Sequence, residues 1–227
     1  MIMLGAASAL LPLGGCVEAQ RSDDSRHFAV NEYEAVLTIV VDQSGSFASY
    51  WDDRALKLFQ ELMDQFFTEG DTDTCRIVIA QLSASRDVVL FEGRPEELRT
   101  KFQKPQDLSD FLRHSANPGG SEVYRATEQA IRYVSTMAGV TENTRLMTVI
   151  LSDMVDTSLP PGRNQAGARM LDALTGYQQQ GGGLALYYVA KEETSRWQDI
   201  LDRAGFQPGS YLIESALVSR PQLPRFE

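Results

Sequence analysis

The chain has few of the residues on which most metal and acid–base sites depend. Its 227 residues include two histidines and two cysteines. Histidine is the commonest metal ligand and general base, so the composition argues against a His-based metal site and against an enzyme. Basic residues are also scarce, because 21 Lys and Arg stand against 31 Asp and Glu, which gives a formal net charge of −10. A nucleic-acid-binding protein needs basic patches to neutralise phosphates, and this composition argues against that class too.

The rest of the composition is that of an ordinary globular protein. Hydrophobic residues make up 43% of the chain and charged residues 23%. These fractions are usual for a folded domain. A chain of this length can bury a proper core and accommodates one α/β domain with little else.

The first fifteen residues, 1–15, are apolar and uncharged, and they run directly into Cys16. Such a segment is too short to span a bilayer as a helix and is typical of a secretory signal peptide. Leu13-Gly14-Gly15-Cys16 resembles the lipobox of bacterial lipoproteins, which implies that Cys16 is lipidated. The chain departs from that pattern in having no Lys or Arg before Arg21. The alternative interpretation is a disordered apolar leader.

The lipoprotein resemblance predicts a location in the bacterial cell envelope. Val17 follows the cysteine, and the sorting rules of such proteins then permit an outer-membrane anchor facing the periplasm. Residues 16–33 are polar and without periodicity, so we expect a flexible tether. Contact with the membrane is expected through the N-terminal lipid only.

The stretch that organises the chain is 35–47, with the sequence AVLTIVVDQSGSF. Its unbroken apolar run is typical of a central parallel strand that is buried on both faces. The polar residues that follow therefore lie at the carboxyl end of the strand, where open α/β sheets place ligands. Asp42, Ser44 and Ser46 offer a carboxylate and two hydroxyls at alternate positions, and Gly45 lets the backbone turn. Hard divalent cations such as Mg²⁺ prefer oxygen donors of this kind.

The pattern Asp42-x-Ser44-x-Ser46 at a strand end resembles the metal-ion-dependent adhesion site of von Willebrand factor A (VWA) domains. In that family a Gly-rich loop carries a threonine hydroxyl to the metal just before a helix. Here Ser121 follows such a loop, 117–120, and keeps the hydroxyl without the methyl group. The alternative interpretation is that Ser121 is the N-cap of the helix that follows.

The third part of the family site is an aspartate at the end of a later strand, usually followed by glycine. Asp153 follows the apolar run 146–151, and Met154 stands where the family has glycine. The resemblance therefore implies a site for Mg²⁺, or for Mn²⁺ or Ca²⁺. Its ligands would be Asp42, Ser44, Ser46, Ser121 and Asp153.

Apolar strands alternate with amphipathic helices along the rest of the chain, which predicts one doubly wound, Rossmann-like α/β domain. Its sheet would be mostly parallel with helices on both faces. The brief turn before 88–91 predicts an antiparallel edge strand. The VWA resemblance covers 34–215 and leaves 216–227 as a C-terminal tail. Strands are expected at 75–83, 88–91, 146–151, 184–190 and 211–213, and helices at 51–68, 121–137, 165–177 and 193–204, with 95–113 weakly helical and interrupted by Pro105.

The resemblance implies a module that binds a protein partner, whose acidic side chain would complete the coordination of the metal. Arg163 lies in a loop at the same edge and is a candidate for the rim of the partner-binding surface. Two other classes stay open. A degenerate module would bind its partner without metal, and a metal-dependent hydrolase would need a base such as His114. The haloacid-dehalogenase type is disfavoured because Ser44 stands where it requires a second aspartate.

Overall fold

The computed structural model describes residues 32–44, 47, 51–69, 73–82, 88–115, 120–215 and 222–224. Its centre is strand β1 (Ala35–Val41), which pairs in parallel with β2 on one side and β4 on the other. The six-stranded sheet has the order β3-β2-β1-β4-β5-β6. The other strands are β2 (Cys75–Gln81), β3 (Val89–Gly93), β4 (Arg145–Leu151), β5 (Gly183–Val189) and β6 (Tyr211–Ser215). The helices are α2 (Leu56–Glu69), α3 (Pro95–Lys101), α4 (Pro105–Ser115), α5 (Val123–Ser135), α6 (Gly162–Gln179) and α7 (Lys191–Ala204).

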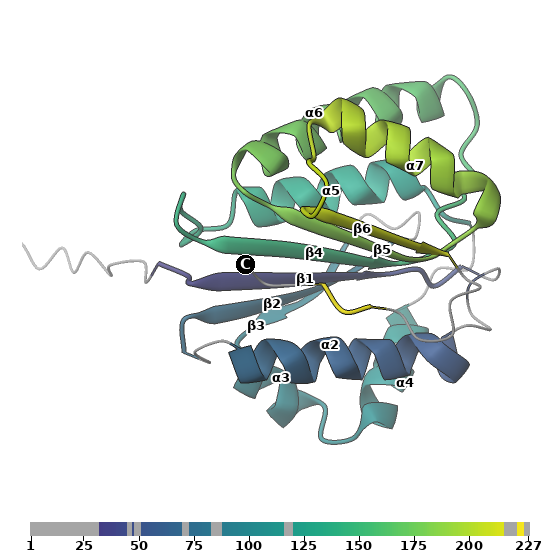
Figure 1. Ribbon diagram of the computed structural model, residues 1–227. Coiled ribbons are helices and arrows are strands. Elements are labelled where there is room, and N and C mark those ends of the chain that lie inside the picture. Colours follow the sequence, from purple (N-terminus) through teal and green to yellow (C-terminus); the bar gives the residue numbers. More distant parts are fainter. Residues whose placement is uncertain are drawn as a thin grey trace, which may run out of the picture.

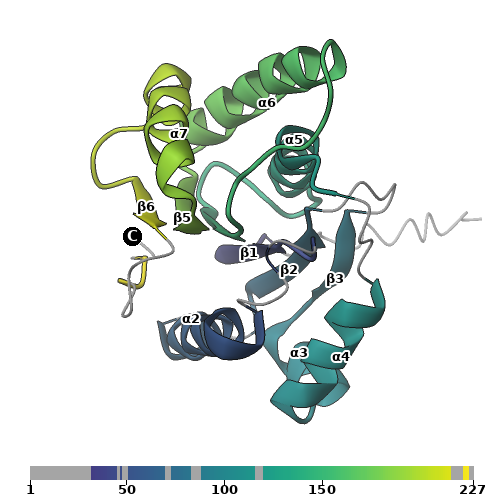
Figure 2. The same ribbon diagram turned by 90° about the vertical axis from the view of Figure 1, so that its right-hand side faces the viewer.

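Helices cover both faces of the sheet, with α5, α6 and α7 on one face and α2, α3 and α4 on the other (Figures 1 and 2). Successive side chains of β1 point to opposite faces of the sheet and so enter the two cores alternately. Val36 and Val40 belong to the core under α5 and α6, whereas Leu37 and Ile39 belong to the core under α2. All seven β1 residues are buried, as the unbroken apolar run predicts for a central strand.

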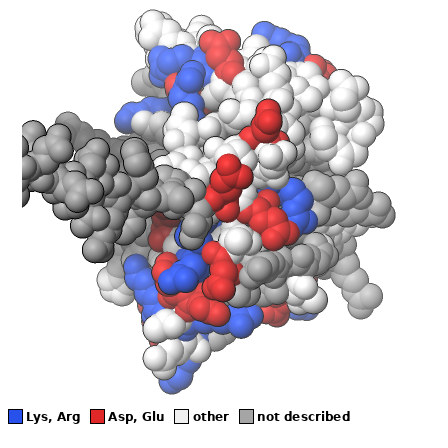
Figure 3. Space-filling view, turned by 90° about the vertical axis from the view of Figure 1, so that its left-hand side faces the viewer, with Lys and Arg blue, Asp and Glu red and all other residues white. Residues whose placement is uncertain are grey.

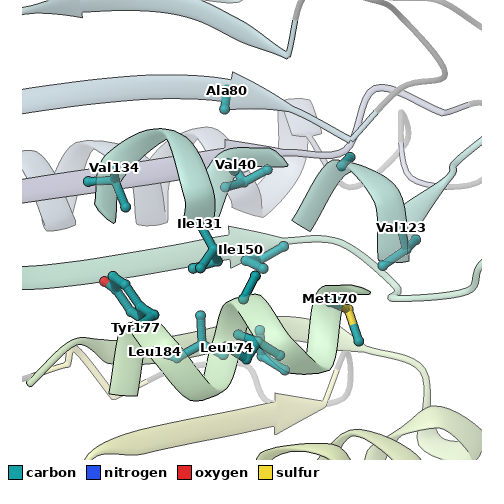
Figure 4. Packing of buried hydrophobic residues seen from close by; sticks show 14 of the residues in the cluster. Val40, Ala80, Val123, Ile131, Val134, Ile150, Met170, Leu174, Tyr177 and Leu184 are labelled. Carbon is teal, nitrogen blue, oxygen red and sulfur yellow. The ribbon is translucent and has the colours of Figure 1, made fainter. Parts of the chain in front are cut away.

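The core under α5 and α6 is formed by apolar side chains on the sides of these helices that face the sheet. Figure 4 shows Ile131 and Val134 of α5 and Leu174 of α6 directed toward Val40 and Ile150 of the sheet. All five side chains are fully buried. Burial of each contributes about 1.5–3 kcal/mol before the entropy of ordering is counted.

Only β3 runs antiparallel to its neighbour β2, and it forms one edge of the sheet. The hairpin expected from the brief turn is thus confirmed. The weakly helical segment is two helices, α3 and α4, and Pro105 begins the second of them. Proline is well tolerated in a first helical turn, where its missing N–H has no partner to lose. The helix expected from Trp51 begins with a π-helical turn, Trp51–Ala55, before α2.

Trp51 and Cys75 are both core residues. Trp51 is buried and its indole N–H donates to the hydroxyl of Ser109, 3.0 Å away. Cys75 at the start of β2 is also buried. Both side chains therefore belong to the core under α2.

The signal peptide, Cys16 and most of the tether lie outside the described residues. In the part of the chain that the structure describes, no helix has the length and apolar character needed to cross a membrane. Figure 3 faces the edge at which the parallel strands begin, where acidic and basic side chains are intermingled. One such pair joins Arg145 at the start of β4 to Glu34, at 2.7 Å. Of the C-terminal tail, Gln222 and Pro224 accept hydrogen bonds at their carbonyls from Tyr187 and Gln65.

A buried polar pair in this core gives a testable prediction. The Thr148 hydroxyl donates to the hydroxyl of Tyr177 at 2.9 Å, and the latter donates to the Gly183 carbonyl at 3.3 Å. Tyr177→Phe should lower the free energy of unfolding by about 1–3 kcal/mol, because Thr148 loses its acceptor inside the core. Adding Thr148→Val removes the orphaned hydroxyl and should restore part of the loss. Denaturant unfolding of both single variants and the double variant measures the coupling, and strict additivity would contradict it.

Candidate metal centre

The candidate site begins at Asp42, one residue beyond β1. Backbone pairing continues past the strand, because the Asp42 N–H donates to the Leu151 carbonyl at 2.9 Å. The carboxylate is 1% exposed. Its Oδ1 accepts the backbone N–H of Ser44 at 2.8 Å, so the predicted alternation of carboxylate and hydroxyl closes into a tight local turn.

Ser121 reaches the same carboxylate from a distant part of the chain. Its hydroxyl donates to Asp42 Oδ1 at 3.0 Å. Helix α5 begins two residues later at Val123 and has Glu122 in its N-cap position. The N-cap interpretation of Ser121 is therefore wrong, because its side chain turns to Asp42 and away from the helix end.

A third hydroxyl, that of Ser152, was not assigned a role from the sequence. It donates to Asp42 Oδ2 at 2.7 Å and is fully buried. Its role follows from the register of β1 and β4. Val41 pairs with Leu151 in the parallel ladder, so the residues that follow them, Asp42 and Ser152, lie side by side. Register between distant strands does not follow from the composition of either strand alone.

Asp153 lies beside the site, and its Oδ1 accepts the N–H of Val155 at 3.0 Å. Met154 follows with φ = 62°, a backbone conformation that favours glycine. The methionine thus occupies the conformation that the family's glycine would adopt without cost. Its side chain is fully buried in the core under α5 and α6, and this burial offsets part of the backbone strain.

The loop after Asp153 holds Ser121 and the start of α5 in place. The Thr157 hydroxyl accepts the N–H of Ser121 at 3.1 Å and donates to its carbonyl at 3.0 Å. Asp156 is buried and its Oδ2 accepts the N–H of Tyr124 at 2.8 Å, which caps the N-terminus of α5 with a distant carboxylate. Gly120 has φ = 112°, and a Cβ there would lie 2.8 Å from Thr157 Oγ1. The loop therefore needs glycine at this position.

Arg163, the predicted rim residue, lies in the first turn of α6. Its Nε is 3.9 Å from Asp156 Oδ1, and its guanidinium lies 5.5 Å from the centre of the Tyr124 ring. The structure thus brings Ser44, Ser121 and Ser152 onto Asp42, with Asp153 adjacent in the chain. Arg163 lies further out, and Ser46 lies outside the described residues.

The electrostatics of the site centre on the buried carboxylate. Burial raises the pKa of Asp42 above its ordinary value of 3.8, and hydrogen bonds from Ser152 and Ser44 lower it by less. The nearby Asp153 carboxylate raises it further. Within the described residues no cationic side chain pairs with Asp42, so the ionised form is stabilised by neutral groups alone.

The donors fit a hard divalent cation in their chemistry. Every side-chain group on or beside Asp42 offers oxygen, and a hydroxyl that donates to a carboxylate keeps lone pairs for a cation. The described residues contain no cluster of three or more His, Cys, Asp or Glu that could hold a metal ion. A metal at this edge would therefore depend on the hydroxyls as well as on the two aspartates.

A mostly parallel sheet with helices on both faces and hydroxyls gathered on an aspartate at the strand ends defines a VWA-like fold. No protein-family model and no curated protein matches the chain. Among solved structures, it is similar to the manganese-loaded TRAP protein of Plasmodium vivax, with 16% identity and a TM-score of 0.53 over 81% of this chain and 69% of that one. It is also similar to the pilus adhesin SpaC from Lactobacillus rhamnosus GG in its open conformation, with 11% identity and a TM-score of 0.54 over 81% of this chain and 28% of the adhesin. At these identities the likeness concerns the fold.

The raised pKa of Asp42 gives a second prediction. A carboxyl whose folded pKa exceeds its unfolded pKa loses its stabilising contribution as pH rises through the folded value. In the metal-free protein, Asp42→Asn should therefore raise the melting temperature at neutral pH, because it removes a buried charge. The amide keeps the shape and one acceptor oxygen, and its N–H can donate to the Ser152 hydroxyl in place of the bond that Oδ2 accepts. The difference should shrink as the pH is lowered from 7 and the wild-type carboxyl, whose pKa is raised, becomes protonated. Calorimetry in chelator across this pH range tests it, and a lower melting temperature for Asp42→Asn at pH 7 would contradict it.

Proposed function

We propose that this protein is a VWA-type interaction module that binds a protein partner through a divalent metal. Asp42, Ser44, Ser46, Ser121 and Asp153 would hold Mg²⁺, Mn²⁺ or Ca²⁺, and a carboxylate of the partner would complete the coordination. The alternative within the same fold is a degenerate module that binds its partner without metal.

One observation carries this proposal. Asp42 is a buried carboxylate that receives hydrogen bonds from three separate segments, namely its own turn, the loop before α5 and the end of β4. A buried charge is costly unless it is paired or coordinates a metal. A buried carboxylate at the end of the central strand lowers the stability of the folded protein. The same carboxylate, with hydroxyls around it that can reorient, is well suited to bind a cation.

The residues of the site suit a partner's carboxylate in particular. Three of the five proposed ligands, Ser44, Ser46 and Ser121, are neutral hydroxyls, so only Asp42 and Asp153 would offset the charge of a bound cation. A bound divalent metal would supply an electrophilic centre with exchangeable positions. The two loops that present the hydroxyls are fixed by the Asp42 turn and by Thr157, so the donors are held in place before any partner arrives.

The two similar solved structures support an interaction role. One is described as manganese-loaded and the other as a pilus adhesin. A hydrolase finds no comparable support. His114, the base that it would need, lies in α4 with its Nδ1 2.6 Å from the Asp110 carbonyl oxygen.

The deciding experiment is thermal unfolding of the full chain in mild detergent, with chelator or with millimolar Mg²⁺ or Mn²⁺. Metal at about 100 times its dissociation constant stabilises the folded state by roughly 2.7 kcal/mol. For a domain of this size the melting temperature should rise by about 5–10 °C. Asp42→Asn should abolish the rise, whereas Asp110→Asn, an exposed carboxylate on α4, should keep it. Absence of a rise in the wild type would leave the degenerate module as the better description.

We also propose that the module is anchored in the bacterial envelope through a lipid on Cys16, with the outer membrane facing the periplasm as a permitted site. The support is the apolar leader and the Leu13-Gly14-Gly15-Cys16 sequence. In a bacterial host, Cys16→Ser should move the protein from the membrane fraction to the soluble fraction. Equal membrane association of both proteins would count against the anchor.

A further inference from the structure

A groove of about 540 Å³ lies between α6 and α7, and every charged residue that lines it is an arginine. Arg163 comes from the first turn of α6, and Arg196 and Arg203 come from α7. We propose that this arginine groove docks an acidic, leucine-containing segment of the protein partner, continuous with the carboxylate that completes the metal centre. The inference rests on the proposed function for the partner's carboxylate, but the groove itself contains no metal ligand.

Two of the three arginines pair with buried acids that do not line the groove. Glu193 is buried and receives both hydrogen bonds from Arg196, at 2.8 and 2.9 Å. Arg163 stands 3.9 Å from the buried Asp156 and over the Tyr124 ring. Arg203 is exposed and has no ion-pair or hydrogen-bond partner among the described residues. The guanidinium groups of Arg163 and Arg196, which are held in this way, lose little entropy when they bind a carboxylate.

The floor of the groove indicates a polypeptide. Ile200 and Leu171 are half-buried aliphatic side chains between the arginines. A nucleic acid or a free anion would pair with the guanidinium groups and leave this apolar surface without a partner. A segment that alternates carboxylates with leucine-like side chains satisfies both, because aliphatic anchors fill the floor while acids meet the rim.

The groove and the candidate metal centre both contact the loop after β4. Pro160 of this loop lines the groove beside Tyr124, whose N–H donates to Asp156, and the next residue, Thr157, holds Ser121. Leu159 on the same loop is 82% exposed. A partner that reaches both sites would thus contact the loop after β4, on which Leu159 is exposed.

The charge of the rest of the protein makes this groove distinctive. The whole chain carries −10, and an acidic partner would be repelled by most of its surface. At the opposite edge of the sheet, acidic side chains lie among the basic ones (Figure 3). An arginine-only lining next to the metal centre thus gives an acidic segment one favourable route of approach.

The test uses the full chain in mild detergent and a fluorescein-labelled peptide of four Glu-Leu-Ser repeats, followed by fluorescence anisotropy. Peptides with Lys-Leu-Ser or Glu-Ser-Ser repeats, and a labelled oligothymidine, are the comparison probes. With Mg²⁺ present the Glu-Leu-Ser peptide should bind best, and more weakly as salt increases. Arg203→Glu should lower its affinity about tenfold or more, the usual scale for reversing a charge at a charged contact. Lys57→Glu on α2 changes the net charge equally on the opposite face and should leave the affinity unchanged.

Removing the metal, with chelator or with Asp42→Asn, distinguishes peptide binding by the groove from peptide binding by the candidate metal centre. If Arg203→Glu weakens binding to a similar degree with Mg²⁺ and with chelator, the groove acts as proposed, whether or not metal adds affinity. Binding that needs Mg²⁺ but is equally strong in Arg203→Glu and Lys57→Glu would overturn the groove and leave the proposed function standing. The proposal would also be overturned if the Lys-Leu-Ser peptide, the Glu-Ser-Ser peptide or the oligothymidine bound as tightly as the Glu-Leu-Ser peptide, or if no peptide bound.

Discussion

The structure is organised around one buried carboxylate, that of Asp42, at the end of the central strand. Burial makes its ionised form costly, and the fold meets that cost with neutral donors drawn from β1, the loop before α5 and the end of β4. These three segments are far apart in the sequence. Pairing of β1 with β4 brings Ser152 to Asp42, and the loop after β4 holds Ser121 there. The site is therefore a property of the sheet order as much as of any local motif.

The loop after β4 links this site to the rest of the protein. Asp156 caps α5, and Thr157 fixes the backbone that carries Ser121. The same loop presents Leu159 and Pro160 at the head of the groove between α6 and α7. A change in the conformation of this loop would thus alter the candidate metal centre, the start of α5 and the groove together, because residues 156–160 contact all three.

The sequence predicts the fold well because its signals are local and periodic. The unbroken run at 35–41 and the alternating strands and helices are sufficient for a doubly wound sheet, and the brief turn before β3 identifies the antiparallel edge. Asp42 and Ser44 follow from the strand end alone. Ser152 does not, since its role depends on the register of β1 and β4. The rejection of Ser121 as a helix cap depends likewise on Asp156, a residue 35 positions away that caps α5 instead.

Recognition of an acidic partner by an acidic protein has to be a short-range effect. At physiological ionic strength charges are screened over about 8 Å, so the net charge of −10 matters less at contact than the groups that line the contact itself. A cation over Asp42 and the three arginines between α6 and α7 would each reverse the local sign of the surface. If the proposed partner contacts both sites, specificity would come from the spacing of carboxylates along that partner, which neither site could read alone.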